Sequence, residues 1–165
     1  MTKNKISYGT VFNYICVVLM LFVIVTQFLP FFPCSDCEGG NASLADYVWF
    51  PNHHKEITKE IMKDKDMYGK EYLVMQAVWA PIVTLLGSVF GIICCLKNAK
   101  KPLFALIPLA IGAVGVYGYL TTKGLVIGQT WLLHLIACAL VLVCSLVVLS
   151  EPIVKAAKKK AASKQ

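Results

Sequence analysis

The chain has 165 residues, of which 58% are hydrophobic and only 15% are charged. Soluble domains typically contain about 25% charged residues, so the composition excludes an ordinary soluble protein. All positive charge behind the net +7 comes from lysine, and the absence of arginine, the usual bidentate binder of phosphate, argues against a nucleic-acid reader.

Four long apolar runs account for much of the chain. They cover residues 11–29, 72–96, 103–120 and 131–149. A hydrocarbon core of about 30 Å requires roughly 20 helical residues, and backbone amides in lipid must be paired within their own segment. The sequence therefore predicts an all-α integral membrane protein, a single domain of four transmembrane helices in an up-down bundle.

The first connection, residues 30–71, is the long one, and it begins with prolines that end a helix. Cys34 and Cys37 follow at C-x-x-C spacing. We expect a disulfide between them, and three roles remain open: a structural bridge, a redox-active pair, or two ligands of a zinc site completed by His53 and His54. Residues 52–67 read as a short charged helix within this loop.

The layout of the four predicted helices and this cysteine pair suggests a redox role. Four helices with Cys34 and Cys37 just past the first resemble the quinone-linked membrane thiol oxidases, and the resemblance implies thiol–disulfide exchange. That family also needs a second cysteine pair between its third and fourth helices, and residues 121–130 contain no cysteine. The inside termini and long first loop are also similar to the claudin-like junction proteins, whose W-G-L-W-C-C loop pattern is absent here.

Glycines recur at three- and four-residue spacing in the second and third runs. The set is Gly87, Gly91, Gly112, Gly115 and Gly118. Because lipid offers little gain from apolar burial, membrane helices associate through close backbone approach at small residues. These glycines are predicted to form the helix-packing faces.

Polar residues within the runs gather near the ends that adjoin the long loop. We expect Gln27, Gln76, Gln129 and His134 to form a polar pocket beneath that loop, since polar groups in a membrane are costly and often functional. The alternative is hydrogen bonding between helices together with snorkelling to the surface.

Lysines divide unevenly among the connections. The segments before the first run, between the second and third, and after the fourth hold ten lysines and one acid, Glu151, whereas residues 30–71 hold five lysines and eight acids. Successive helices cross the membrane in opposite directions, so the three lysine-rich segments lie on one side of it. The positive-inside rule places that side, and with it both termini, in the cytoplasm, and residues 30–71 outside. We expect a plasma-membrane protein whose basic tail, residues 150–165, contacts anionic lipid headgroups.

No catalytic constellation stands out in the sequence. The favoured hypothesis is a non-enzymatic subunit, scaffold or sensor that docks a membrane or extracellular protein through its first outer loop. Thiol–disulfide exchange at Cys34 and Cys37 is the alternative. Transport of a small solute is a weaker one, because the helices hold no acidic or basic side chain other than His134.

Overall fold

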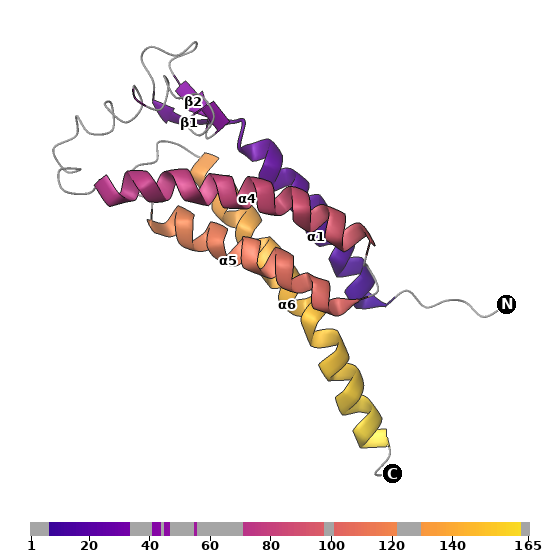
Figure 1. Cartoon of the computed structure of the whole chain (residues 1–165). Coiled ribbons are helices and arrows are strands. Elements are labelled where there is room, and N and C mark those ends of the chain that lie inside the picture. The colour runs from indigo at the N-terminus through magenta and orange to yellow at the C-terminus, as the bar shows by residue number, and fades with distance from the viewer. Residues whose placement is uncertain are drawn as a thin grey trace.

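The computed structural model describes residues 7–33, 41–43, 45–46, 55, 71–97, 101–121 and 130–162. Long helices dominate it (Figure 1), namely α1 (Tyr8–Thr26), α4 (Glu71–Lys97), α5 (Leu106–Thr121) and α6 (Thr130–Ala162). A short 3-10 helix, η3 (Pro102–Ala105), precedes α5. Four segments in these helices are long and apolar enough to cross a bilayer. The predicted all-α four-helix bundle is confirmed, and the chain is an integral membrane protein.

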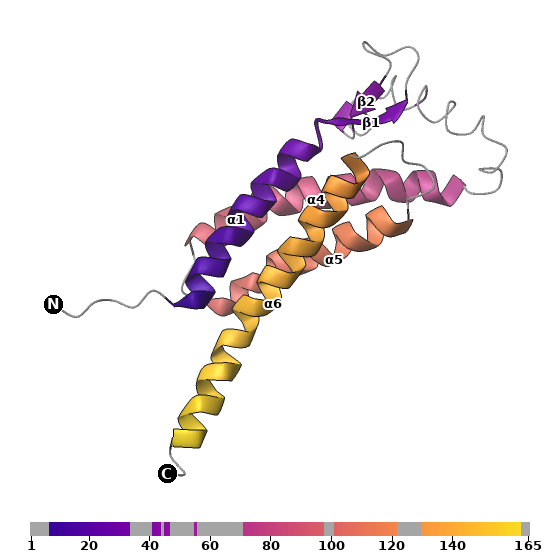
Figure 2. The ribbon, with the colours of Figure 1, turned by 180° about the vertical axis from the view of Figure 1, so that it is seen from behind.

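The four helices form a ring in which each packs against two neighbours. α4 contacts α1 and α5, and α6 contacts α5 and closes the ring against α1. Successive helices run in opposite directions, as Figures 1 and 2 show from two sides. We call one end of the bundle the lysine end, because Lys97 ends α4 there and Lys101 precedes η3. At this end α1 begins and α6 extends out of the bundle. The opposite end is called the hairpin end below.

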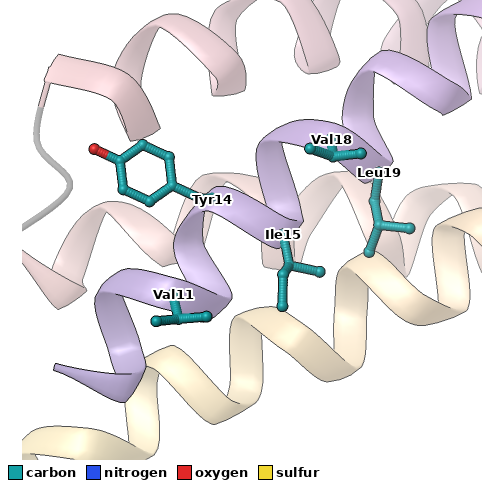
Figure 3. A pocket seen from close by; sticks show the side chains of 5 residues that line it. All are labelled: Val11, Tyr14, Ile15, Val18 and Leu19. Atoms are coloured by element: carbon teal, nitrogen blue, oxygen red, sulfur yellow. The ribbon is translucent and has the colours of Figure 1, made fainter. Parts of the chain in front are cut away.

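The inner face of α1 shows how the helices pack. Its buried residues recur every three or four positions and are Gly9, Asn13, Cys16, Val17, Met20, Val23 and Thr26. On the outside of the bundle, Val11, Tyr14, Ile15, Val18 and Leu19 line a shallow hollow, in which Ile15 and Leu19 point toward α6 (Figure 3). Such an apolar outer surface would be unfavourable in water and is suited to contact with acyl chains.

The five glycines singled out in the sequence all lie against another helix. A Cβ atom on Gly112 would stand 2.7 Å from the Leu142 amide nitrogen and 2.8 Å from the Cys138 carbonyl oxygen of α6. A Cβ on Gly118 would overlap Ala80 of α4. The other three lie against Ile111, Met20 and Cys138 in the same way, at Gly87, Gly91 and Gly115. Close backbone approach at these positions holds α5 to both neighbours.

A small β-hairpin follows α1. The helix ends at Thr26, three residues earlier than expected, and β1 (Pro30–Pro33) then pairs antiparallel with β2 (Asn41–Ser43). The pairing joins Pro30 to Ser43 and Pro33 to Asn41. Both prolines lie in an edge strand, where a missing amide hydrogen costs little. The expected helix at residues 52–67 lies outside the described residues, apart from Lys55.

Helix α6 is longer than the expected span of 131–149. It continues to Ala162, so most of the segment expected as a basic tail is the last part of this helix. Pro152 removes one helical hydrogen bond, but the alanines and lysines after it favour helix strongly enough to continue it. The 33 residues of α6 measure about 50 Å at 1.5 Å each, well beyond a hydrocarbon core of about 30 Å.

At the lysine end, Glu151 of α6 closes the start of α1. Its carboxylate accepts hydrogen bonds from the Ser7 hydroxyl and the Gly9 amide, and its Oε1 lies 2.5 Å from Nζ of Lys155. The glutamate side chain is only 8% exposed. One helix thus supplies the carboxylate that caps another.

Candidate functional site

The clearest concentration of polar side chains inside the bundle lies at the hairpin end. Thr26 and Gln27, where α1 ends, and His134, in the second turn of α6, are almost fully buried. Two of the four residues of the predicted pocket, Gln27 and His134, therefore lie at the same end. The side chain of Gln76 and the whole of Gln129 lie outside the described residues.

Gln27 is joined to α4 through Thr84. The Gln27 Nε2 donates to Thr84 Oγ1 over 2.9 Å, and that hydroxyl donates to the Ala80 carbonyl oxygen over 2.8 Å. Thr84 is fully buried, and it was absent from the pocket predicted from the sequence. No sequence signal singles it out, because a threonine hydroxyl that bonds a carbonyl one turn earlier is common in membrane helices.

His134 is joined to α1 through Thr26. The Thr26 hydroxyl donates to the Val23 carbonyl oxygen over 3.0 Å and lies 3.2 Å from His134 Nδ1. Because the hydroxyl has a single proton, its use on Val23 makes Nδ1 the donor to Thr26. This assignment, made from the hydrogen-bond network, places a proton on Nδ1.

Tyr119 of α5 completes the arrangement. Its ring stacks on the His134 imidazole with centroids 4.7 Å apart and planes 18° apart, and its side chain also interacts with Thr84 and Gln27. The tyrosine is 1% exposed. The five residues Thr26, Gln27, Thr84, Tyr119 and His134 are called the polar cluster below, and every helix of the ring contributes to it.

Two hydrogen bonds next to the polar cluster hold the described part of the long connection. The Ala45 amide donates to the Gln27 carbonyl oxygen over 3.0 Å, and the Thr130 hydroxyl of α6 donates to the Pro30 carbonyl oxygen over 2.6 Å. These bonds attach the hairpin and the residues after it to the ends of α1 and α6.

A capping box orders the chain just past β2. The Ser43 amide donates to Asp46 Oδ2 over 2.9 Å, while the Asp46 amide donates to Ser43 Oγ over 3.0 Å. This reciprocal pattern is typical of the first turn of a helix. These bonds fix the turn between Ser43 and Asp46.

The cysteines and histidines of the predicted redox or metal site are not among the described residues. Cys34 and Cys37 are in the segment that joins β1 to β2, and with His53 and His54 they lie outside the described residues. The five cysteines in the described helices form no disulfide with one another, and the described part of the chain contains no group of three or more potential metal ligands.

The contacts of the polar cluster predict a measurable coupling between α1 and α4. We expect Gln27→Leu and Thr84→Val to be non-additive by about 1 kcal/mol in the free energy of unfolding, which is typical of a hydrogen bond between membrane helices. A double-mutant cycle measures this coupling: the parent chain, the two single variants and the double variant are each unfolded in mixed detergent micelles.

Thr121→Val is the control for that cycle. The Thr121 hydroxyl bonds only to the backbone carbonyls of Tyr117 and Gly118 in its own helix. Its loss should therefore add to that of Gln27→Leu without coupling. Equal coupling in both cycles would show that the Gln27–Thr84 bond contributes nothing of its own.

Comparisons with protein-family models, with curated proteins and with solved structures give no match to this chain.

Proposed function

We propose that the chain is a non-enzymatic plasma-membrane protein that presents residues 30–71 outside the cell to dock a membrane or extracellular protein. The observation that carries the proposal is the attachment of this segment to the bundle, through the Ala45 amide on Gln27 and the Thr130 hydroxyl on Pro30. A docking segment held on a rigid support loses less conformational entropy when its partner binds.

The orientation is part of the proposal and rests on charge. The sequence next to the lysine end holds ten lysines and a single acid, Glu151, so this end faces the cytoplasm under the positive-inside rule. The hairpin end then faces outward. Its long connection carries five lysines and eight acids, a density of charge suited to specific polar contacts at the rim of an interface.

The form of the polar cluster favours a support over a transport path. Its members bond to one another and to helix backbone, as Gln27 does to Thr84 and Thr26 does to His134. A solute carrier would need these groups to release one another in turn. The thiol–disulfide alternative would use Cys34 and Cys37, which lie outside the described residues.

Site-specific crosslinking tests the docking proposal. A photoreactive amino acid replaces Lys55 on the long connection or, in the matched control, Lys97 at the lysine end, both of which are exposed. We expect a discrete adduct with one membrane or extracellular protein from position 55, at native expression levels in the source cell, and none from position 97.

A second variant connects the adduct to the support. Ser43→Ala removes the capping box with Asp46 and should reduce the yield of the adduct from position 55 severalfold, because the turn between Ser43 and Asp46 is no longer fixed. A chain recovered alone from both crosslinking positions would refute docking through residues 30–71.

A further inference from the structure

The last part of α6 extends beyond the bundle. Residues 152–162, called the basic arm, are helical and exposed throughout. In Figures 1 and 2 this part of α6 projects past the lysine end, at the far side of the molecule from the hairpin. Within the described residues, no other helix covers it.

Lysines occur on both sides of the basic arm. Lys155, Lys158 and Lys159 follow at spacings of three and four residues and lie on one side of the helix. Lys160 lies on the opposite side with Ile153 and Ala157, and Ile153 is 71% exposed. The arm therefore presents positive charge on both sides, which favours contact with an anionic membrane surface.

The level of the basic arm follows from its attachment. Glu151 contacts Ser7 and Gly9 at the very start of α1, so the arm begins where the bundle ends. Lys155 is then one helical turn beyond this level, and Lys158 and Lys159 are about two turns beyond it. Lysine side chains reach several ångströms back along a surface, which brings their ammonium groups to headgroup level.

We propose that the basic arm binds the headgroups of anionic phospholipids in the leaflet at the lysine end. Charge complementarity selects this occupant: the arm carries four lysines and no acid, and the nearest acid, Glu151, is already used by α1 and Lys155.

Two double variants, each of which removes two lysines, test whether lipid binding depends on the basic arm or only on the total positive charge of this end. Lys158→Gln with Lys159→Gln alters the arm, while Lys97→Gln with Lys101→Gln alters exposed lysines at the same end of the bundle. The purified full-length chain, in zwitterionic micelles, is titrated with short-chain phosphatidylglycerol and followed by calorimetry. Micelles have no sidedness, so an altered membrane orientation cannot affect the comparison.

The expected result is a dissociation constant raised about 25-fold in the arm variant, at about fivefold per lysine near an anionic surface. The control variant should change it less than about fivefold, and raising the salt from about 0.05 M to about 0.5 M should weaken binding to the parent chain. A smaller rise in the arm variant, an equal rise in the control, or equal binding of phosphatidylcholine would each overturn the proposal.

Discussion

Replacing Gly112 by alanine is expected to destabilise the bundle by about 1 to 3 kcal/mol, the usual cost of overpacking a tight core. The new methyl group would stand 2.7 Å from the Leu142 nitrogen and 2.8 Å from the Cys138 oxygen. Both are backbone atoms of α6 and cannot rotate away. The helices must separate, and unfolding of the purified chain by sodium dodecyl sulfate measures the loss.

Gly87→Ala is the matched control, since it makes the same chemical change at another helix contact. Its methyl group would meet the Ile111 Cγ1 at 3.0 Å, so a side chain need give by only a few tenths of an ångström. Alanine also favours helix over glycine by about 1 kcal/mol. We expect Gly87→Ala to be within about 0.5 kcal/mol of the parent or more stable. Equal losses at the two positions would show that backbone contact at Gly112 is not special.

The contrast between these glycines marks how far the sequence predicts the packing. Their spacing in two apolar runs identified them as helix-packing residues, because in lipid this role depends on side-chain size alone. Spacing does not say which glycine meets backbone and which meets a side chain. That difference depends on the rotation of α5 against α6 at Gly112 and of α4 against α5 at Gly87, which only the three-dimensional structure reveals.

The ends of the elements were less predictable than their centres. The apolar runs located the four helices, but Thr26 ends α1 early because the chain turns into β1 at Pro30. The pairing of β1 with β2 depends on residues about ten positions apart, and neither strand is long enough to give an alternating pattern. The fourth run was expected to end at residue 149, and α6 continues past it through Pro152 to Ala162.

The polar cluster was predictable in part for a similar reason. Glutamine and histidine are conspicuous in an apolar run, so Gln27 and His134 stood out. Thr84 and Tyr119 are ordinary residues for the middle and the end of a membrane helix, so the sequence does not single them out. The structure brings them to Gln27 and His134, so the complete arrangement depends on the relative heights of four helices.

Glu151→Ala is expected to reduce the free energy of unfolding by about 1 to 2 kcal/mol, the range seen when a helix loses its N-terminal cap. Ser7, the residue before α1, makes no capping hydrogen bond with its own side chain, and the first turn of α1 contains no acid. The Glu151 carboxylate supplies both the acceptor and the negative charge that the positive end of a helix favours. Denaturation of the purified chain measures the loss.

Two further variants separate the cap from the ion pair. Lys155 is 64% exposed, so Lys155→Gln should cost less than about 0.5 kcal/mol, as surface ion pairs on one helix do. Gly9→Ala places a methyl group on the Glu151 carboxylate and should destabilise the parent chain. In the Glu151→Ala chain the same change should cost little, since the carboxylate is gone. If Gly9→Ala costs the same in both chains, or Lys155→Gln costs as much as Glu151→Ala, then capping of α1 is not what Glu151 contributes.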